Sequence, residues 1–72
     1  MKRLNELEIG EEAVVTQMIA ENRRLKDIGL VVGTRIKCLF RSPLGDPAAY
    51  RVRGAVIAIR KEDGQKIEIE VL

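Results

Sequence analysis

The chain has 72 residues, of which 46% are hydrophobic and 33% charged, and its formal net charge is +2. This composition is typical of a folded protein rather than a disordered one. A chain of this length can form one small core, so we expect a single domain over residues 1–72. The mild charge does not require a nucleic-acid partner, which usually needs a clustered basic patch.

The cellular compartment is indicated by cysteine content and hydropathy. Cys38 is the only cysteine, so the chain cannot form an internal disulfide, which suits a reducing environment. The first residues, MKRLNELEIGEE, carry charges where a signal peptide would need a long apolar stretch. The apolar run at residues 55–59 is far shorter than the roughly 20 residues that span a bilayer. We therefore expect a soluble cytoplasmic protein.

The first half of the chain predicts a strand and then a helix. Residues 12–19 are rich in β-branched and apolar side chains, and a bulge near Val15 would let both Val14 and Val15 be buried. A helix follows, which Asn22 can cap and Gly29 can end in a left-handed conformation.

Two leucines should fix the end of this helix. Leu25 and Leu30 are spaced as the contact pair that accompanies a Schellman ending at Gly29, and Ile28 shares the face of Leu25. So short a helix needs this apolar cluster to pack onto a sheet.

A second strand follows a turn in which Gly33 fits the third position of type II. The alternation predicts three residues on the core-facing side of this strand, namely Ile36, Cys38 and Phe40. It predicts three basic residues on the opposite side, namely Arg35, Lys37 and Arg41.

The second half predicts three further strands. Residues 42–47 form a loop, because Ser-Pro and Asp-Pro resist regular structure, and Gly54 is a bulge candidate between the next two strands. The strand at 55–60 should bury Ile57 and Ile59. Residues 61–65 read as a turn, and residues 66–72 alternate most clearly of all. About five short strands and one short helix favour a mainly β fold, a small closed barrel.

Enzyme constellations are nearly absent from the sequence. There is no histidine, Cys38 lies on an apolar strand face, and Ser42 has no base nearby. The carboxylate pairs favour a solvated surface, and the usual ligands of iron, zinc and copper are missing. We therefore expect no enzyme, no cofactor and no tight transition-metal site.

Basic residues gather on the helix and on the strands, the latter being Arg35, Lys37, Arg41, Arg51 and Arg53. A solvated surface is the simplest explanation, and an acidic or membrane-proximal partner is the functional alternative. The loop tip at Leu44 is a second candidate for recognition. We select six residues as the candidate partner-contact surface: Arg23, Arg24, Lys26, Arg41, Leu44 and Asp46.

The chain resembles the FeoA family of bacterial ferrous-iron uptake in three stretches, RLKDIGLVVGTRIKCL, SPLGDPAAYRVRG and AIRKEDGQKIEIE. The matching positions run through nearly the whole chain: Leu4, Leu7, Gly10, Arg24, Leu25, Gly29, Leu30, Gly33, Gly45, Asp46, Pro47, Gly54, Arg60, Asp63, Ile67 and Ile69. The chain departs from the family pattern at Ile28, Val32, Ile59 and Gly64.

The resemblance implies an SH3-like barrel that assists FeoB, a membrane Fe(II) transporter with a cytoplasmic GTPase domain. It implies membrane contact only through this partner. The absence of histidine and of a second cysteine favours a protein–protein role in the cytoplasm over iron carriage, and the oligomeric state stays open between a monomer and a weak dimer. The first alternative is a regulatory module related to the C-terminal domain of metal-dependent repressors, acting on a DNA-binding partner. The second is a weak divalent-metal binder that uses surface carboxylates.

Overall fold

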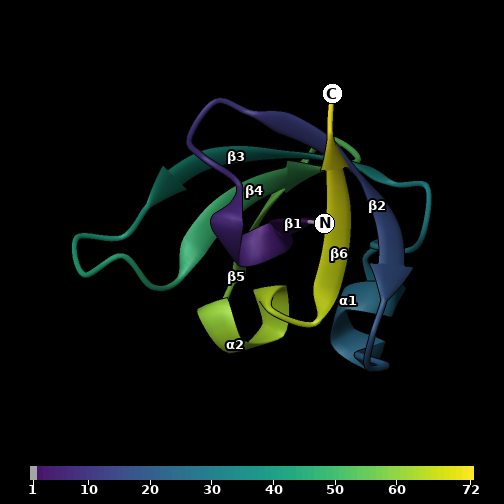
Figure 1. The fold of residues 1–72 in the computed structure, drawn as a ribbon. Coiled ribbons are helices and arrows are strands. Elements are labelled where there is room, and N and C mark those ends of the chain that lie inside the picture. The colour runs from purple at the N-terminus through teal and green to yellow at the C-terminus, as the bar shows by residue number, and fades with distance from the viewer. Residues whose placement is uncertain (1) are drawn as a thin grey trace.

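The computed structural model describes residues 2–72, and its main feature is one antiparallel sheet in the order β1-β6-β2-β3-β4-β5 (Figure 1). The six strands are β1 (Lys2–Arg3), β2 (Glu12–Met18), β3 (Arg35–Arg41), β4 (Ala48–Val52), β5 (Ala55–Ile59) and β6 (Ile67–Val71). The helical elements are the 3-10 turn η1 (Leu4–Glu6) and the short helices α1 (Arg23–Asp27) and α2 (Lys61–Gly64).

The mainly β prediction is confirmed, with one strand and one short helix more than the pattern indicated. The extra strand, β1, is only two residues long and exists because it pairs with β6, at Lys2 with Ile69 and Arg3 with Glu68. The extra helix, α2, occupies the predicted turn at 61–65. Its first backbone N–H, that of Lys61, donates to Asp46 Oδ1 at 2.8 Å, and this bond from a distant loop cannot be read from local sequence.

The core lies on the inner side of the curved sheet and draws on every part of the chain. Strand residues supply most of it, and four leucines from outside the strands complete it. These leucines, all fully buried, are Leu4, Leu7, Leu25 and Leu30. The η1 turn and α1 are therefore held in place by burial of apolar side chains, which is the main stabilising term in so small a domain.

The bulge predicted in the first long strand is present. The register of β2 against β6 shifts between Val15 and Gln17, which leaves Thr16 as the extra residue. Val15 is fully buried and Val14 is half-buried. The bulge therefore lies near Val15, as predicted, but it follows both valines, which stay on opposite faces of the strand. The expected burial of Val14 is wrong.

A second bulge, in β3, was not predicted and reverses the faces that follow it. The register against β4 shifts between Cys38 and Phe40, so Leu39 is the extra residue. Phe40 consequently points outward and is 56% exposed, and the prediction that it belongs to the core is wrong. Arg41 is turned inward by the same shift, so its predicted place on the outer face is also wrong.

The helix α1 begins and ends as predicted. Asn22 Oδ1 accepts the backbone N–H of Leu25 at 3.2 Å, and Gly29 has a φ of +91°. The Leu30 N–H donates to the Leu25 carbonyl and the Gly29 N–H to the Lys26 carbonyl, each at 3.0 Å. These two bonds are the Schellman pair, and they satisfy carbonyls that the helix itself leaves unpaired.

The turn between β4 and β5 differs from the prediction. Arg53 and Gly54 have φ values of +51° and +81°, and they alone separate Val52 from Ala55 at the strand ends. Two consecutive positive φ angles make a two-residue hairpin of type I′, whose twist matches that of the strands. Gly54 therefore serves a tight turn, and the expected bulge at this position is wrong.

Candidate functional site

The helical part of the predicted contact surface is open to solvent. Arg23, Arg24 and Lys26 are all exposed on α1. Arg24 has a partner within the chain, because its Nη2 lies 3.7 Å from Asp63 Oδ2 in α2. This ion pair joins the two helices, and at a largely exposed site it contributes little to stability.

A partly apolar groove lies beside α1, near these cations. A depression of about 540 Å³ lies between the helix, the end of β2 and the turn after the helix. Its lining includes Met18, Leu30, Val31 and Val32, with Lys26 at its rim. Val31 and Val32 are exposed, so this end of the molecule combines apolar and basic surface.

Arg41 and Asp46 each have a structural role within the chain. Arg41 Nη2 donates to the Leu7 carbonyl at 2.7 Å and to the Asn5 carbonyl at 3.3 Å. It therefore ties the N-terminal segment around η1 to the sheet. Asp46 accepts the N–H of Lys61, which starts α2. Both side chains therefore form hydrogen bonds with backbone groups of the chain, at the base of the loop.

The loop tip is the most exposed apolar point among these residues. The loop at 42–47 is closed by a backbone bond from the Gly45 N–H to the Ser42 carbonyl at 2.8 Å, and by one from the Ser42 N–H to the Pro47 carbonyl at 3.1 Å. Leu44 is 95% exposed. Figure 1 shows this loop projecting from the sheet on the opposite side of the molecule from α1. The structure therefore separates the predicted set into two regions.

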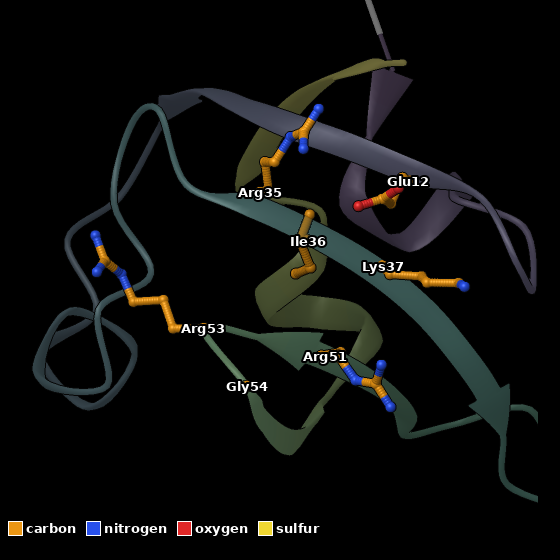
Figure 2. A pocket seen from close by; sticks show the side chains of 7 residues that line it. All are labelled: Glu12, Arg35, Ile36, Lys37, Arg51, Arg53 and Gly54. Atoms are coloured by element: carbon orange, nitrogen blue, oxygen red, sulfur yellow. The ribbon is translucent and has the colours of Figure 1, made fainter.

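The strands place a further group of cations together, which we call the basic face: Arg35, Lys37, Arg51 and Arg53. Arg35 and Lys37 alternate with buried residues on β3, so they share its outer side. Lys37 lies directly opposite Arg51 in the register of β3 and β4, and Arg53 follows in the turn. These side chains line a depression of about 270 Å³ (Figure 2).

The basic face is poorly neutralised. Among residues 2–72, Glu12 is the only carboxylate that lines the depression, and it lies opposite Lys37 on β2. None of the four cations is in an ion pair with a residue of the described chain, 2–72. The sequence pattern shows these basic residues, but the pairing of Lys37 with Arg51 depends on the register, and none of the four belongs to the predicted contact set.

The ionisable groups of the core are held neutral. Burial raises the pKa of the Cys38 thiol, and the charges of Arg41 and Glu11 act on it in opposite directions. Burial also raises the pKa of Tyr50, whose hydroxyl lies 3.4 Å from the Leu4 carbonyl. Cys38 is therefore a buried thiol, as predicted, and not a thiolate at neutral pH.

Two further findings limit the chemistry of the described residues. Within residues 2–72, no group of three or more His, Cys, Asp and Glu side chains is placed to hold a metal ion. In the same range, the helices are too short or too polar to cross a bilayer.

The comparisons with known proteins give a consistent result. The model of the FeoA domain family matches residues 2–71. A curated relative, the Fe(2+) transport protein A/Fe(2+) transporter FeoB fusion protein of Porphyromonas gingivalis, is 34% identical over 73 residues and covers 97% of this chain. The chain spans 9% of the length of that relative.

Solved structures agree in fold. The FeoA protein from Chlorobium tepidum is 38% identical with a TM-score of 0.91, over 99% of this chain and 70% of that one. Two more distant structures show the fold alone. Stenotrophomonas maltophilia FeoA complexed with zinc, described as an SH3 domain protein, is 23% identical with a TM-score of 0.83, over 97% and 91% of the two chains. A manganese-dependent transcriptional repressor is 18% identical with a TM-score of 0.88, over 99% and 36%.

The predicted SH3-like fold is confirmed by these neighbours. The family match covers all but the two terminal residues, and the same stretches that suggested the resemblance lie within it. This chain belongs to the FeoA domain family.

Proposed function

We propose that this protein is a non-enzymatic accessory protein of bacterial Fe(II) uptake. In this proposal it acts in the cytoplasm by binding the cytoplasmic, GTPase-containing part of a FeoB-type transporter.

The observation that carries the proposal is the fused relative. In the Porphyromonas gingivalis protein, a segment 34% identical to this chain is part of one polypeptide with a FeoB transporter. Fusion raises the effective concentration of one part around the other, so it favours pairs whose contact is useful. A separate chain would need a contact surface of its own to reach the same partner.

The chemistry of the chain supports binding rather than catalysis. The sequence has no histidine, and the thiol of Cys38 is buried and protonated. What the chain presents to solvent instead is the exposed cations Arg23 and Lys26 and the apolar tip residue Leu44. At the α1 end, Lys26 lies beside the exposed residues Val31 and Val32, and such a mixture of cationic and apolar surface is common in protein interfaces.

A titration tests the proposal. The isotope-labelled chain is titrated with the soluble cytoplasmic domain of FeoB from the same organism, and backbone amide shifts are followed. We expect saturable shift changes confined to one surface of the chain. The variant Leu44→Asp should weaken binding if the tip is in contact, whereas Ile9→Asp, at another exposed apolar residue, should not. No shift change at high micromolar domain concentration would contradict the proposal.

A further inference from the structure

The basic face contains a pairing that works against the fold. Lys37 and Arg51 are direct neighbours across β3 and β4, and like charges in this position destabilise a sheet. The carboxylate that could offset them, Glu12, lies across from Lys37 on the other side of β3 and forms no ion pair with it. A neutral residue at either position would avoid this repulsion.

The neighbouring cations add to the same charge. Arg35 precedes Lys37 on the same side of β3, and Arg53 lies at the turn that follows β4. Arg53 is also the one non-glycine residue within 2–72 with a positive φ, in a turn position that favours asparagine or glycine. Strained or repulsive features that a fold keeps often belong to a binding site.

We propose that the basic face binds an extended, acidic segment of a partner protein. Side chains that alternate along an extended peptide and share one side are about 6.8 Å apart, and so are Arg35 and Lys37 along β3. Alternating carboxylates on such a segment can therefore meet successive cations in turn. Arg35 and Arg51 can each donate a forked pair of hydrogen bonds to a carboxylate. Arg53, whose Nε donates to the Gly29 carbonyl, keeps its two terminal nitrogens for the same purpose.

Apolar surface beside the cations fits a peptide better than a simple anion. Val56 lies directly opposite Arg51 on β5 and is 56% exposed, and Phe40 is exposed on the same side of β3. An acidic segment with intervening apolar side chains would cover both. A small oxyanion held between Lys37 and Arg51 would leave both of these apolar side chains uncovered.

Other polyanions fit less well. Among residues 2–72 the aromatics are Phe40 and Tyr50, and Tyr50 is buried, so successive nucleic-acid bases have no stacking platform. An anionic membrane would favour cations around a protruding loop, whereas these cations line a depression. A second copy of this chain carries the same formal net charge of +2, so the two copies repel each other overall.

This inference deepens the proposed function, on which it rests, by naming the chemistry of the partner segment. Its test uses a fluorescein-labelled peptide of alternating glutamate and valine, and the same peptide with glutamine for glutamate. Fluorescence anisotropy at low salt measures binding to the full chain. We expect the glutamate peptide to bind, the glutamine peptide to bind at least about tenfold more weakly, and affinity to fall as salt rises.

Two double variants locate the binding. Lys37→Gln/Arg51→Gln removes two charges from the basic face and should weaken binding by about tenfold or more. Lys2→Gln/Lys66→Gln removes the same charge from exposed positions elsewhere and should bind like the parent chain. The first variant should also melt at the same or a higher temperature than the parent, which would exclude loss of fold as the cause.

Several results would overturn the inference. The inference fails if the two peptides bind equally well, if both double variants lose the same affinity for the glutamate peptide, or if the glutamate peptide does not bind. Binding of pyrophosphate, a single-stranded oligonucleotide or phosphatidylserine vesicles in place of the peptide would assign the face to another anion. Self-association that Lys37→Gln/Arg51→Gln abolishes would assign it to a second copy.

The outcomes also separate this inference from the proposed function. If the FeoB domain binds with shift changes away from the basic face, the function stands and the inference fails. If the peptide binds at the basic face and the FeoB domain does not bind, the face has another acidic partner and the proposed function fails.

Discussion

Gly29 shows how one residue can serve both a helix end and a long-range contact. Its φ of +91° is costly for any residue with a Cβ, and a Cβ built there would lie 2.7 Å from Arg53 Cδ. The Gly29 carbonyl accepts a hydrogen bond from Arg53 Nε at 3.3 Å and one from Thr34 Oγ1 at 2.9 Å. The helix end is thus connected to the β4–β5 turn.

We expect Gly29→Ala to lower the free energy of unfolding by about 1–2 kcal/mol from the backbone conformation alone. Moving the Arg53 side chain away should add to this loss. Gly33→Ala is the matched control, because Gly33 has a φ of +93° and open space around its Cβ position. Urea unfolding of both variants measures the two effects. A Gly29→Ala variant no less stable than Gly33→Ala would show that the close approach of Arg53 adds nothing to the loss in the free energy of unfolding.

The buried thiol of Cys38 should make the free energy of unfolding depend on pH. Because burial raises the pKa of its thiol, the folded chain keeps a proton that the unfolded chain loses. The contribution of this thiol to stability is therefore complete below the ordinary thiol pKa of about 8.5. It falls as pH rises from there toward the raised pKa, by at most about 1.4 kcal/mol per pH unit.

The variant Cys38→Ala isolates this effect. It should be less stable than the parent at neutral pH, because it leaves a small cavity, but its stability should change less between about pH 8.5 and 10. Chemical unfolding at a series of pH values checks this. Tyr50, whose pKa burial also raises, should reduce stability at still higher pH in both proteins. Equal pH slopes in this window would contradict the assignment to Cys38.

At the scale of elements, the bulge in β3 decides which side chains serve the fold. The extra residue Leu39 exchanges the two faces of the strand after Cys38. Phe40 is placed outside, and Arg41 is directed toward the N-terminal segment. One inserted residue thereby converts an expected surface cation into the link between β3 and the segment around η1.

We expect Arg41→Met to lower the free energy of unfolding by about 1.5–3 kcal/mol, the usual range for hydrogen bonds to a charged group. The variant keeps much of the side-chain volume and removes the donors to the Leu7 and Asn5 carbonyls. Arg35→Met, on the outer side of the same strand, should change stability by less than about 0.5 kcal/mol. Urea unfolding provides both values, and similar losses in the two variants would refute the structural role of Arg41.

At the scale of the whole molecule, charge is distributed unevenly over the sheet. The outer side of β3 and β4 carries the basic face, whereas β6 alternates its buried residues with Glu68 and Glu70. The strands that bring the cations together lie on either side of the loop at 42–47. The repulsion between Lys37 and Arg51 is therefore a product of the folded state and should be weaker in the unfolded chain.

This repulsion predicts a dependence of stability on salt. Raising the salt concentration from a low level should screen the cations and increase the free energy of unfolding of the parent chain. Lys37→Gln/Arg51→Gln should gain about 0.2–1 kcal/mol at low salt and show a weaker salt dependence. Unfolding at two salt concentrations measures this, with Lys2→Gln/Lys66→Gln as the control. The same salt dependence in all three proteins would mean that the repulsion between Lys37 and Arg51 does not contribute to the stability of the parent chain.

Local sequence was a good guide where the cause is local. The cap at Asn22, the Schellman ending at Gly29 and the type II turn at Gly33 each depend on residues close in sequence, and each is confirmed. The choice of contact residues was less secure for a physical reason. Arg41 and Asp46 look like surface charges in the sequence, but each finds a backbone partner far along the chain.

The sequence by itself determined the mainly β composition, the short capped helix and membership of the FeoA domain family, because alternation, turn residues and motif order are properties of the chain. Only the tertiary structure decided which side Phe40 and Arg41 take, since a bulge depends on pairing with another strand. It also decided that Lys37 faces Arg51 in an unneutralised cluster, because register is fixed by burial on the opposite side of the sheet.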